Sequence, residues 1–364
     1  MRKQFALIVV LTSFFLSGCQ FNDLDKRFFV VAIGVDLTQD EKNPYRVIMK
    51  LAIPSAQVEP GKSRFQIIKK ESNSIPEAIR IIQSMVDKKL DFGHCRVIIL
   101  NEDILQHDQL AVIKWFIKRP DIQGISYVAV GKPSAEKVLS WKVKSERLPA
   151  NALILAFNEV TNNSPYVMSD ILNDYYMRLR EDGIDPYLPI IEPIKGSFRI
   201  NKAVVFKEKK MKAELNPNET RLLNELLNNE KTNLINVGKR NERLFVNAEH
   251  TDTKWKIIVP KKGKPYVLLY IKIHGIVEES EMTLHRRSDL AKYEKKAASQ
   301  ISSRVKEFLI HLQELEVDPL GLGLKYQAKY GITNNNISQW KAIYSNLEFK
   351  VKTDVKLKGT GAMY

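Results

Sequence analysis

An apolar segment that ends in Leu16-Ser17-Gly18-Cys19 constrains this chain most, because it determines on which side of a membrane the rest folds. Two basic residues, Arg2 and Lys3, precede it. The run from Phe5 to Leu16 has the length of an export signal and is shorter than the roughly 20 apolar residues that span a bilayer. Small residues before a cysteine are typical of the lipobox of bacterial lipoproteins, in which the thiol receives a diacylglyceryl group.

The lipobox predicts that residues 1–18 are a cleaved signal peptide and that Cys19 is the lipidated first residue of the mature chain. Two acyl chains anchor a protein stably, whereas a single chain binds only marginally. We therefore expect a protein that is anchored to membrane lipid through acylated Cys19. The alternative is an ordinary cleaved signal with a chance cysteine.

The charge balance is strongly basic, with 57 Lys and Arg against 42 Asp and Glu, or a net charge of +15. This excess suits an anionic membrane surface beside the anchor, although scattered lysines also simply keep a surface solvated. Nucleic acid is not expected as a partner, because an exported chain seldom meets it and no RNP, zinc-finger or helix-turn-helix signature occurs.

The sequence contains no recognisable catalytic or metal-binding motif. It has no G-x-S-x-G, P-loop, H-E-x-x-H or C-x-x-C sequence, and its 6 histidines have no ligand spacing. We expect no enzyme activity, no metal and no cofactor. Acidic pairs at turns, such as Asp182 with Asp185, are expected to be solvated, and Cys95, in an apolar run, is expected to be a small buried hydrophobe.

The chain from 19 to 195 is predicted to be an α/β domain. Phe28 to Asp36 is a continuous apolar run typical of a central strand, and Tyr45 to Ile53 is its expected hairpin partner. Strands and helices then alternate, which favours parallel crossover units. The expected helices are 76–89, 103–118, 133–144, 150–158 and 166–181, and Pro186, Pro189, Pro193 and Gly196 are expected to mark a domain boundary.

A small middle α+β domain is predicted over 196–262 and a C-terminal domain over 263–364. In the middle unit, strands are expected at 244–248 and 255–259, and Asn216-Pro217-Asn218-Glu219 predicts a capping box before a helix. In the last unit, a long amphipathic helix from about Ser288 and a terminal antiparallel strand over 347–357 are expected. The fold class is thus mixed α/β and α+β, with three dissimilar domains, each a β-sheet flanked by helices.

Several short motifs, taken in order, resemble one protein family. They are Cys19, Ala32-Ile33-Gly34-Val35-Asp36, Gly93-His94 before an apolar strand, Asn216-Pro217-Asn218-Glu219 and Asp318-Pro319-Leu320-Gly321-Leu322-Gly323. Together they are similar to the Ger(x)C family, the lipoprotein C subunits of spore germinant receptors. One departure is visible, because Cys19 is followed by Gln20-Phe21 where the family usually has Trp-Asp.

The resemblance implies three mixed α/β domains without known catalysis. It also implies assembly with integral-membrane A and B subunits of a nutrient germinant receptor. The expected location is the outer face of the cell membrane, at the inner membrane of a Bacillus-type or Clostridium-type spore. A solute-binding lipoprotein of the cell envelope is the alternative, and it would need a cleft between two similar lobes.

Without a catalytic set, function is expected to reside in surfaces and in the turns between rigid elements. The candidate structural or partner-contact residues are Asp36, His94, Asp318, Gly321 and Gly323. The last three are expected to end the long helix and to join it to the final strand. A phosphate-binding loop is a weaker interpretation of the same glycines.

Overall fold

The computed structural model describes residues 26–53, 64–107, 109–144, 150–158, 164–228, 233–237, 243–281, 287–331 and 334–358. The signal segment and Cys19 lie outside the described residues, so lipidation stays a prediction. Within the described ranges, no helix is both long enough and apolar enough to cross a membrane.

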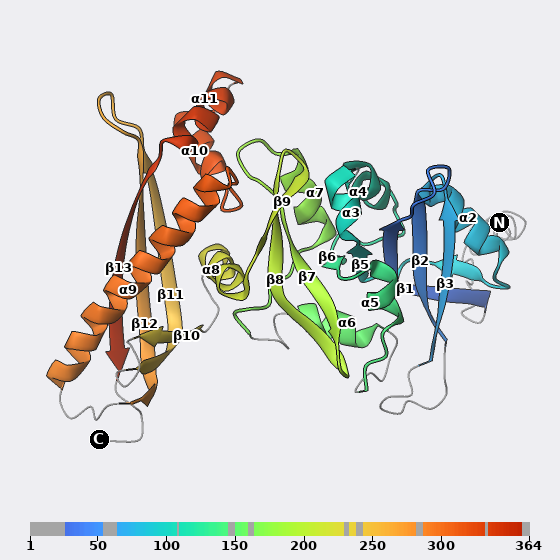
Figure 1. Cartoon of the computed structure of the whole chain (residues 1–364), viewed down its shortest axis with the longest axis horizontal. Helices are drawn as coiled ribbons and strands as arrows, with labels where there is room; N and C mark the ends of the chain where they lie inside the picture. Colours follow the sequence, from blue (N-terminus) through green and yellow to red (C-terminus); the bar gives the residue numbers. More distant parts are fainter. Residues whose placement is uncertain are drawn as a thin grey trace, which may run out of the picture.

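The strands form two sheets, which lie side by side along the long axis of the molecule (Figure 1). Among the described residues, the first sheet has nine strands in the order β3-β2-β1-β5-β6-β7-β8-β9, with β4 paired to β1. The second sheet has the order β10-β11-β12-β13. Strands of the first sheet are β1 (Arg27–Leu37), β2 (Tyr45–Ala52), β3 (Phe65–Ser72), β4 (Lys89–Asp91), β5 (Val97–Leu100), β6 (Tyr127–Gly131), β7 (Tyr187–Ile194), β8 (Ser197–Lys207) and β9 (Lys210–Leu215).

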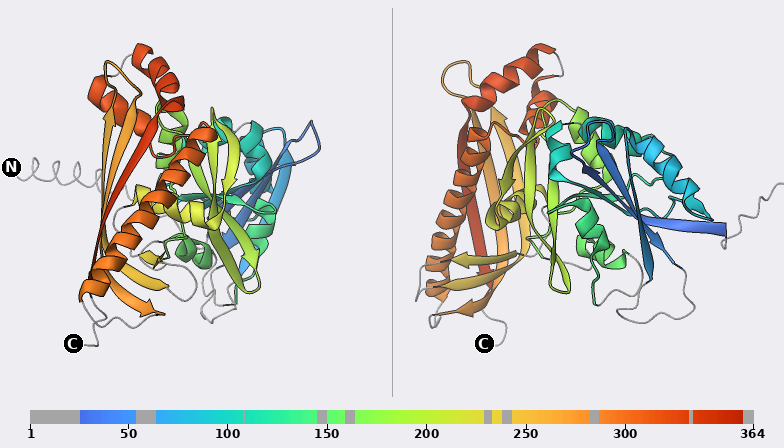
Figure 2. Two further views of the ribbon diagram at one scale, coloured as in Figure 1. Left: turned by 60° about the vertical axis from the view of Figure 1, so that its left-hand side comes forward. Right: turned by 45° about the vertical axis from the view of Figure 1, so that its right-hand side comes forward.

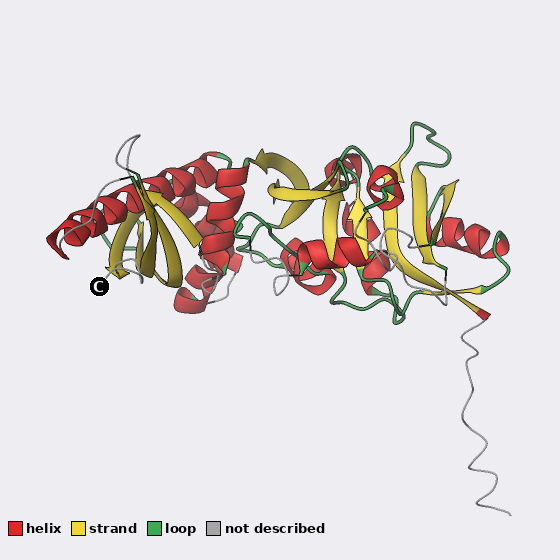
Figure 3. Ribbon diagram, turned by 90° about the horizontal axis from the view of Figure 1, so that it is seen from below, coloured by secondary structure: helices red, strands yellow, loops and turns green. Residues whose placement is uncertain are grey.

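Helices cover both faces of the first sheet, as its apolar central strands require (Figure 3). β1 pairs antiparallel with β2 and parallel with β5, as the apolar run predicted. Ile33 and Val35 of β1 belong to the core on one face, and Ala32 belongs to the core on the other. The first core includes α2 (Ile75–Ser84), α3 (Glu102–His107), α4 (Gln109–Ile117) and α7 (Leu172–Arg180); the second includes α5 (Ala135–Ser140) and α6 (Asn151–Phe157).

Several predicted helices differ in extent from the observed ones, and the helix expected over 133–144 covers only Ala135–Ser140. The helix expected over 76–89 ends at Ser84, because Lys89–Asp91 forms the short strand β4 beside β1. The helix expected from 166 begins only at Leu172. A strand pairing that exists only in the folded chain therefore replaces part of a local helical pattern.

The proline-rich segment is a strand of the first sheet. Pro189 and Pro193 lie within β7, which pairs with β6 only at Ile190 and Ile191 and so leaves both prolines outside that ladder. β7 continues into β8 and β9, so paired strands cross the predicted boundary between 195 and 196. A proline lacks the N–H donor that a sheet ladder needs, and it is tolerated where that donor has no partner.

The second sheet is built around one long helix. Its strands are β10 (Asn233–Val237), β11 (Leu244–Ile258), β12 (Tyr266–Ser280) and β13 (Glu348–Lys358), and the helix is α9 (Arg287–Glu314). β11 is one continuous strand where two were expected, and it pairs with β12 across the predicted boundary between 262 and 263. The mixed fold class is confirmed, whereas the division into three units stays a prediction, because sheet membership alone does not define a folding unit.

β13 runs parallel to β12, and the predicted antiparallel pairing is wrong. α9 has 28 residues and so spans about 42 Å at about 1.5 Å per residue, which returns the chain to the end where β12 began. Two further helices, α10 (Leu322–Tyr330) and α11 (Asn334–Ser345), occupy that end, and β13 then starts beside Tyr266 (Figure 1). Alternation within a strand gives its buried face but not the direction of its partner.

A helix between the two sheets carries the predicted capping box. α8 (Pro217–Leu227) begins after Asn216, whose side chain accepts hydrogen bonds from the N–H groups of Asn218 and Glu219, while Glu219 accepts from the Asn216 N–H. The capping box is thus confirmed. Figure 2 shows α8 between the sheets, and one apolar core continues from the first sheet through Leu223 of α8 to the second sheet.

Candidate functional site

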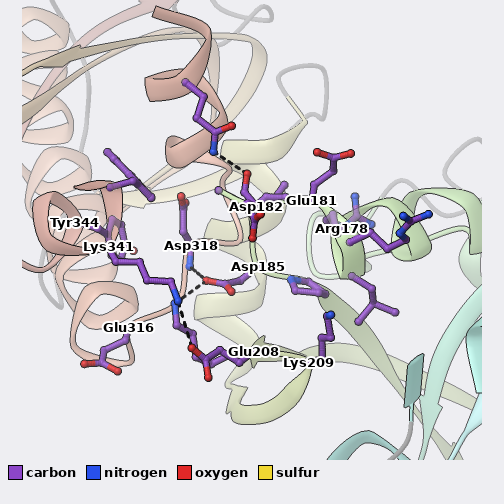
Figure 4. Close-up of a pocket in the computed structure, with 18 of the residues that line it drawn as sticks. Arg178, Glu181, Asp182, Asp185, Glu208, Lys209, Glu316, Asp318, Lys341 and Tyr344 are labelled. Carbon is purple, nitrogen blue, oxygen red and sulfur yellow. Dashed lines mark hydrogen bonds and ion pairs between the residues drawn. The ribbon is translucent and has the colours of Figure 1, made fainter. Parts of the chain in front are cut away.

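The sequence-derived candidates separate into two places. We call the first sheet with its helices α2–α7 the first region, and the second sheet with α9–α11 the second region. Asp36 and His94 lie in the first sheet and its loops, whereas Asp318, Gly321 and Gly323 lie where the second region meets the first. Cys19 is outside the described residues. The junction between the regions brings together three of the five described candidates, and polar side chains from distant segments meet there (Figure 4).

Asp318 begins the turn that leads from α9 into α10. Its Oδ1 accepts a hydrogen bond from the Leu322 N–H (3.0 Å) and its Oδ2 accepts one from the Gly323 N–H (2.7 Å). Gly321, between them, has a positive φ of 64°, which favours glycine over residues with a side chain. The Asp318 carboxylate therefore satisfies donors at the start of α10 that have no partner within the helix.

The expected helix stop is only partly correct. α9 ends at Glu314, before the motif, while Gly323 lies inside α10 and not in the turn. Two helices therefore separate Asp318 from the final strand. Sequence patterns did not indicate α10, because its apolar residues form no clear stripe and its first turn is held by the side chain of Asp318.

Two glycines from distant segments meet at this junction. Gly183 follows α7, and its carbonyl accepts a hydrogen bond from the Leu324 N–H at 3.0 Å. A Cβ on Gly323 would lie 2.6 Å from the Gly183 Cα and 2.7 Å from the Gly183 oxygen, closer than any real contact. The two backbones can approach this closely only because neither residue has a side chain.

Asp185 and Asp318 bond reciprocally across the same junction. The Asp185 N–H donates to the Asp318 carbonyl at 2.9 Å, and the Asp318 N–H donates to Oδ2 of Asp185 at 2.7 Å (Figure 4). The same Asp185 oxygen lies 3.4 Å from Nζ of Lys207. The expectation that Asp182 and Asp185 are both solvated is wrong for Asp185, which is half-buried and bonded, and correct for exposed Asp182.

Burial perturbs both carboxyl groups. Burial raises the pKa of Asp318 to about 7, the N–H groups of Leu322 and Gly323 oppose this rise, and the negative charge of Asp185 adds to it. Burial also raises the pKa of Asp185, and Lys207 counteracts it. Asp318 is only 5 % exposed, so it has little water to stabilise its charge.

A polar cleft of about 340 Å³ opens beside these residues. Lys341 of α11 reaches Glu208 of the β8–β9 turn at 3.4 Å across it (Figure 4). The Tyr344 hydroxyl donates to the Val317 carbonyl at 2.6 Å. Trp340, stacked on Tyr326 with ring centroids 5.2 Å apart, forms another part of the wall.

The cleft contains acids and cations but no nucleophile paired with a base. Its lining residues include no His or Cys, and four of them are bonded in pairs, Asp185 with Asp318 and Lys341 with Glu208. Among the residues that the structure describes, no three His, Cys, Asp or Glu side chains are grouped as metal ligands. The bonds between Asp185 and Asp318 and the close approach of Gly183 to Gly323 make the cleft part of a joint between the two regions.

Asp36 performs a similar capping task inside the first region. Its carboxylate accepts from the Ala135 N–H (2.7 Å) and the Glu136 N–H (3.0 Å), which ties the end of β1 to the start of α5. Burial raises its pKa. His94 is exposed and its ring lies edge-on to Phe29, so it does not join Asp36.

Cys95 has the environment of a structural thiol. It is fully buried, and burial raises its pKa to about 12, so the reactive thiolate is disfavoured. Its predicted burial is confirmed. The residues that sequence reasoning missed are Gly183 and Asp185, and the only available signal was that Asp185-Pro186 repeats the Asp-Pro pair of Asp318-Pro319.

Family models match nearly the whole chain in two parts. The model described as "Spore germination protein N-terminal domain" matches residues 20–193. The model described as "Spore germination B3/GerAC like, C-terminal" matches residues 201–361. The first match starts directly after Cys19, and the gap between the matches lies in the β7–β8 hairpin.

Individual relatives are similar over their full length. Spore germination protein GerQC of Bacillus cereus is 23% identical over 99% of this chain and 99% of its own. Spore germination protein KC of Bacillus subtilis (strain 168) is 24% identical over 98% of this chain and 95% of its own. The crystal structure of the GerBC protein has a TM-score of 0.59 at 18% identity, covering 89% of this chain and 97% of that one, and so shares the fold.

Proposed function

The chain belongs to the Ger(x)C family of spore germination proteins, and we propose that it is the lipid-anchored, non-catalytic subunit of a nutrient germinant receptor complex. The observation that carries this proposal is the succession of both family domains directly behind the lipobox cysteine. Acylated Cys19 would hold the mature chain on the outer face of the cell membrane, at the spore inner membrane. Its partners would be the integral-membrane A and B subunits.

The non-catalytic role is supported by the character of the junction cleft. Asp185 and Asp318 in it are bonded to one another, Lys341 pairs with Glu208, and the cleft of about 340 Å³ lies between two dissimilar sheets. A solute-binding lipoprotein would instead offer a cleft between similar lobes. The proposed role is therefore assembly through surfaces, with the junction holding those surfaces in a defined relative position.

Cysteine substitution tests the anchor. We expect Cys19→Ala to leave the protein unprocessed or released, and to weaken germination by nutrients, in membrane fractionation and spore germination assays. Cys95→Ala is the matched control, since that buried thiol is separate from the lipobox and should leave the protein in the membrane fraction. Processing and membrane retention of Cys19→Ala as in the wild type would contradict the anchor.

Co-purification tests the complex. A C-terminal affinity tag on the wild-type chain should recover the integral-membrane subunits from detergent-solubilised spore membranes. The Cys19→Ala chain should recover much less of them, because it is no longer held at the same surface. Recovery of the tagged chain alone from wild-type spores, with the receptor's membrane subunits present in the lysate, would contradict the subunit role.

A further inference from the structure

The outer face of the second sheet is open, and its residues line up in rows across three strands. α9 covers the inner face, where Val267, Leu269 and Ile271 of β12 are buried (Figure 1). Residues that alternate with these point away from α9. The pairing register places Lys256, Leu268 and Lys350 in one row and Lys254, Tyr270 and Lys352 in the next.

Positive charge is concentrated at the end of this face where β11 turns into β12. The hairpin lysine face, as we name it, consists of exposed Lys254, Lys256, Lys261, Lys262, Lys264, Lys350 and Lys352. One acidic residue, Glu348, lies among them, 3.6 Å from Lys350. In the described part of the chain, no carboxylate lies within ion-pair distance of the other six lysines.

The opposite end of the same face is different, because its charges are balanced. Asp252 and Asp354 flank Lys272 in one row. His250 lies 3.3 Å from Asp252, and Lys358 lies 3.7 Å from Glu249. The uncompensated charge is therefore a property of the hairpin end and not of the whole sheet.

Apolar and aromatic side chains run between the two columns of lysines. Tyr266, Leu268 and Tyr270 of β12 form this central strip, and Tyr270 is 38% exposed. Nζ of Lys350 lies 4.1 Å from the centroid of the Tyr266 ring. Tyrosine at the edge of a charged surface is typical of groups that sit at the boundary between water and lipid, with an apolar body and a polar tip.

We propose that the hairpin lysine face docks on the surface of an anionic phospholipid membrane. The inference rests on the proposed function, in which the lipidated N-terminus brings the chain to a membrane. Charge complementarity identifies the occupant, since each basic residue held near an anionic bilayer contributes up to about 1 kcal/mol. Docking would give the chain a second membrane contact far from Cys19 in the sequence and would restrict its orientation.

Lysine chemistry favours a membrane over an acidic protein. Every cation of the hairpin lysine face is a lysine, a flexible point charge without the planar fork with which arginine binds carboxylates in fixed pairs. The phosphate groups of a lipid bilayer form a diffuse layer, and lysines can be attracted to it without pairing in a fixed geometry. A flat, open face also suits a planar surface, whereas a protein partner is generally held by buried anchors in pockets.

Vesicle binding by the non-acylated chain tests the proposal. The probe is residues 20–364, which keeps every described element, mixed with vesicles of phosphatidylcholine alone or with an equal part of phosphatidylglycerol. We expect co-sedimentation only with the anionic vesicles, and we expect it to weaken in high salt because salt screens exposed charges. The quadruple variant Lys254→Gln, Lys256→Gln, Lys350→Gln and Lys352→Gln should bind at least about tenfold more weakly.

Two control variants make the result specific. Replacing the exposed Lys42, Lys114, Lys118 and Lys212 of the first region by Gln changes net charge equally and should alter binding less than about twofold. Replacing the four lysines of the second sheet by Arg should preserve binding and melting temperature. All of these lysines are exposed, so the variants should fold like the wild type, and circular dichroism checks this.

Three outcomes would overturn the proposal. These are no binding of the wild type to anionic vesicles, equal losses in both Gln variants, or a Gln variant that binds vesicles normally but no longer co-purifies with the receptor's membrane subunits. The last would assign the face to a protein partner. Because the probe has no acyl group, failure here leaves the Cys19 anchor untouched, and failure of the anchor leaves vesicle binding measurable.

Discussion

The two sheets bury their strands differently. The first has apolar cores on both faces, so its strands serve as an internal scaffold. The second has its core on the α9 side only, and its other face alternates exposed lysines with tyrosine and leucine. A strand with one solvent-exposed face can hold charged side chains on that face without losing core contacts on the other. The second sheet therefore offers a broad binding surface, and the first does not.

Both regions nevertheless use an aspartate to hold the start of a helix. Asp36 in the first region and Asp318 at the junction each use both carboxylate oxygens to accept two N–H groups from the start of a helix. Asp36 holds a helix on its own sheet. Asp318 also contacts Asp185 from the other region, so a change there reaches both sheets.

The largest effect is expected from Gly323→Ala. Its methyl group would lie 2.6 Å from the Gly183 Cα, so the two backbones must separate. Alanine is better than glycine in a helix by about 1 kcal/mol, but overpacking against the Gly183 backbone costs more. We expect the free energy of unfolding to fall by about 2 kcal/mol and the melting temperature to fall by several degrees. Unfolding should then separate into two transitions, one for each region.

The control for this substitution is Gly93→Ala. The new methyl group would meet only the side-chain oxygen of Asp91, at 3.1 Å, so the melting temperature should change little. If Gly323→Ala melted like the wild type in calorimetry, the close approach of the two glycines would not couple the regions.

Asp318→Ala should be next in size. It leaves the N–H groups of Leu322 and Gly323 without an acceptor in a buried site, which costs about 2 kcal/mol. Asp36→Ala should cost a similar amount by the same mechanism, but it should leave the junction intact. Chemical unfolding measures both, and limited proteolysis within 181–186 should accelerate only in Asp318→Ala.

This pair also distinguishes structural from partner-contact roles. An Asp318→Ala chain that kept the wild-type melting temperature while losing association with receptor subunits would make Asp318 a contact residue. Unchanged stability, assembly and germination would contradict both roles.

Titration of the Asp318 carboxyl group is expected to change the melting temperature by a few degrees. The pKa of Asp318 rises from 3.8 to about 7 on folding, so between these values the folded state binds more protons than the unfolded state. Stability therefore falls as pH rises through this window, and the melting temperature should be lower near pH 8 than near pH 5.

Asp318→Asn should reduce this difference, because an amide does not titrate. Asp40→Asn is the control. Hydrogen bonding from Asn43 lowers the pKa of Asp40, so titration of Asp40 changes stability only at pH values below this window. A wild-type and an Asp318→Asn chain with the same pH dependence, measured by thermal scans in matched buffers, would contradict the assignment.

The smallest effect should come from the exposed pair across the cleft. Lys341 and Glu208 are 69% and 73% exposed, so solvent screens their attraction. Lys341→Ala should change the free energy of unfolding by no more than about 0.5 kcal/mol. A loss above about 1 kcal/mol in a denaturant titration would mean that this ion pair, and not the glycine contact, joins the regions.

Local patterns in the sequence determined much of the fold. The hairpin of β1 and β2, the capping box before α8 and the long amphipathic helix α9 were all predicted, because each depends on residues that are neighbours in the chain. Pro319 and Gly321 together indicated a turn, and the structure has one there, leading into α10. Whether Asp318, Gly321 and Gly323 contact a partner protein stays a prediction.

Only the tertiary structure decided how distant segments meet. The parallel pairing of β13 with β12, the pairing of proline-containing β7 with β6, and the contact of Gly183 with Gly323 each join residues far apart in sequence. The spacing of apolar residues in a strand or helix indicates which face is buried, but not which segment packs against that face. The expectation that Asp185 is solvated failed for this reason, because its donor, the backbone N–H of Asp318, lies 133 residues away and approaches only when the two regions dock.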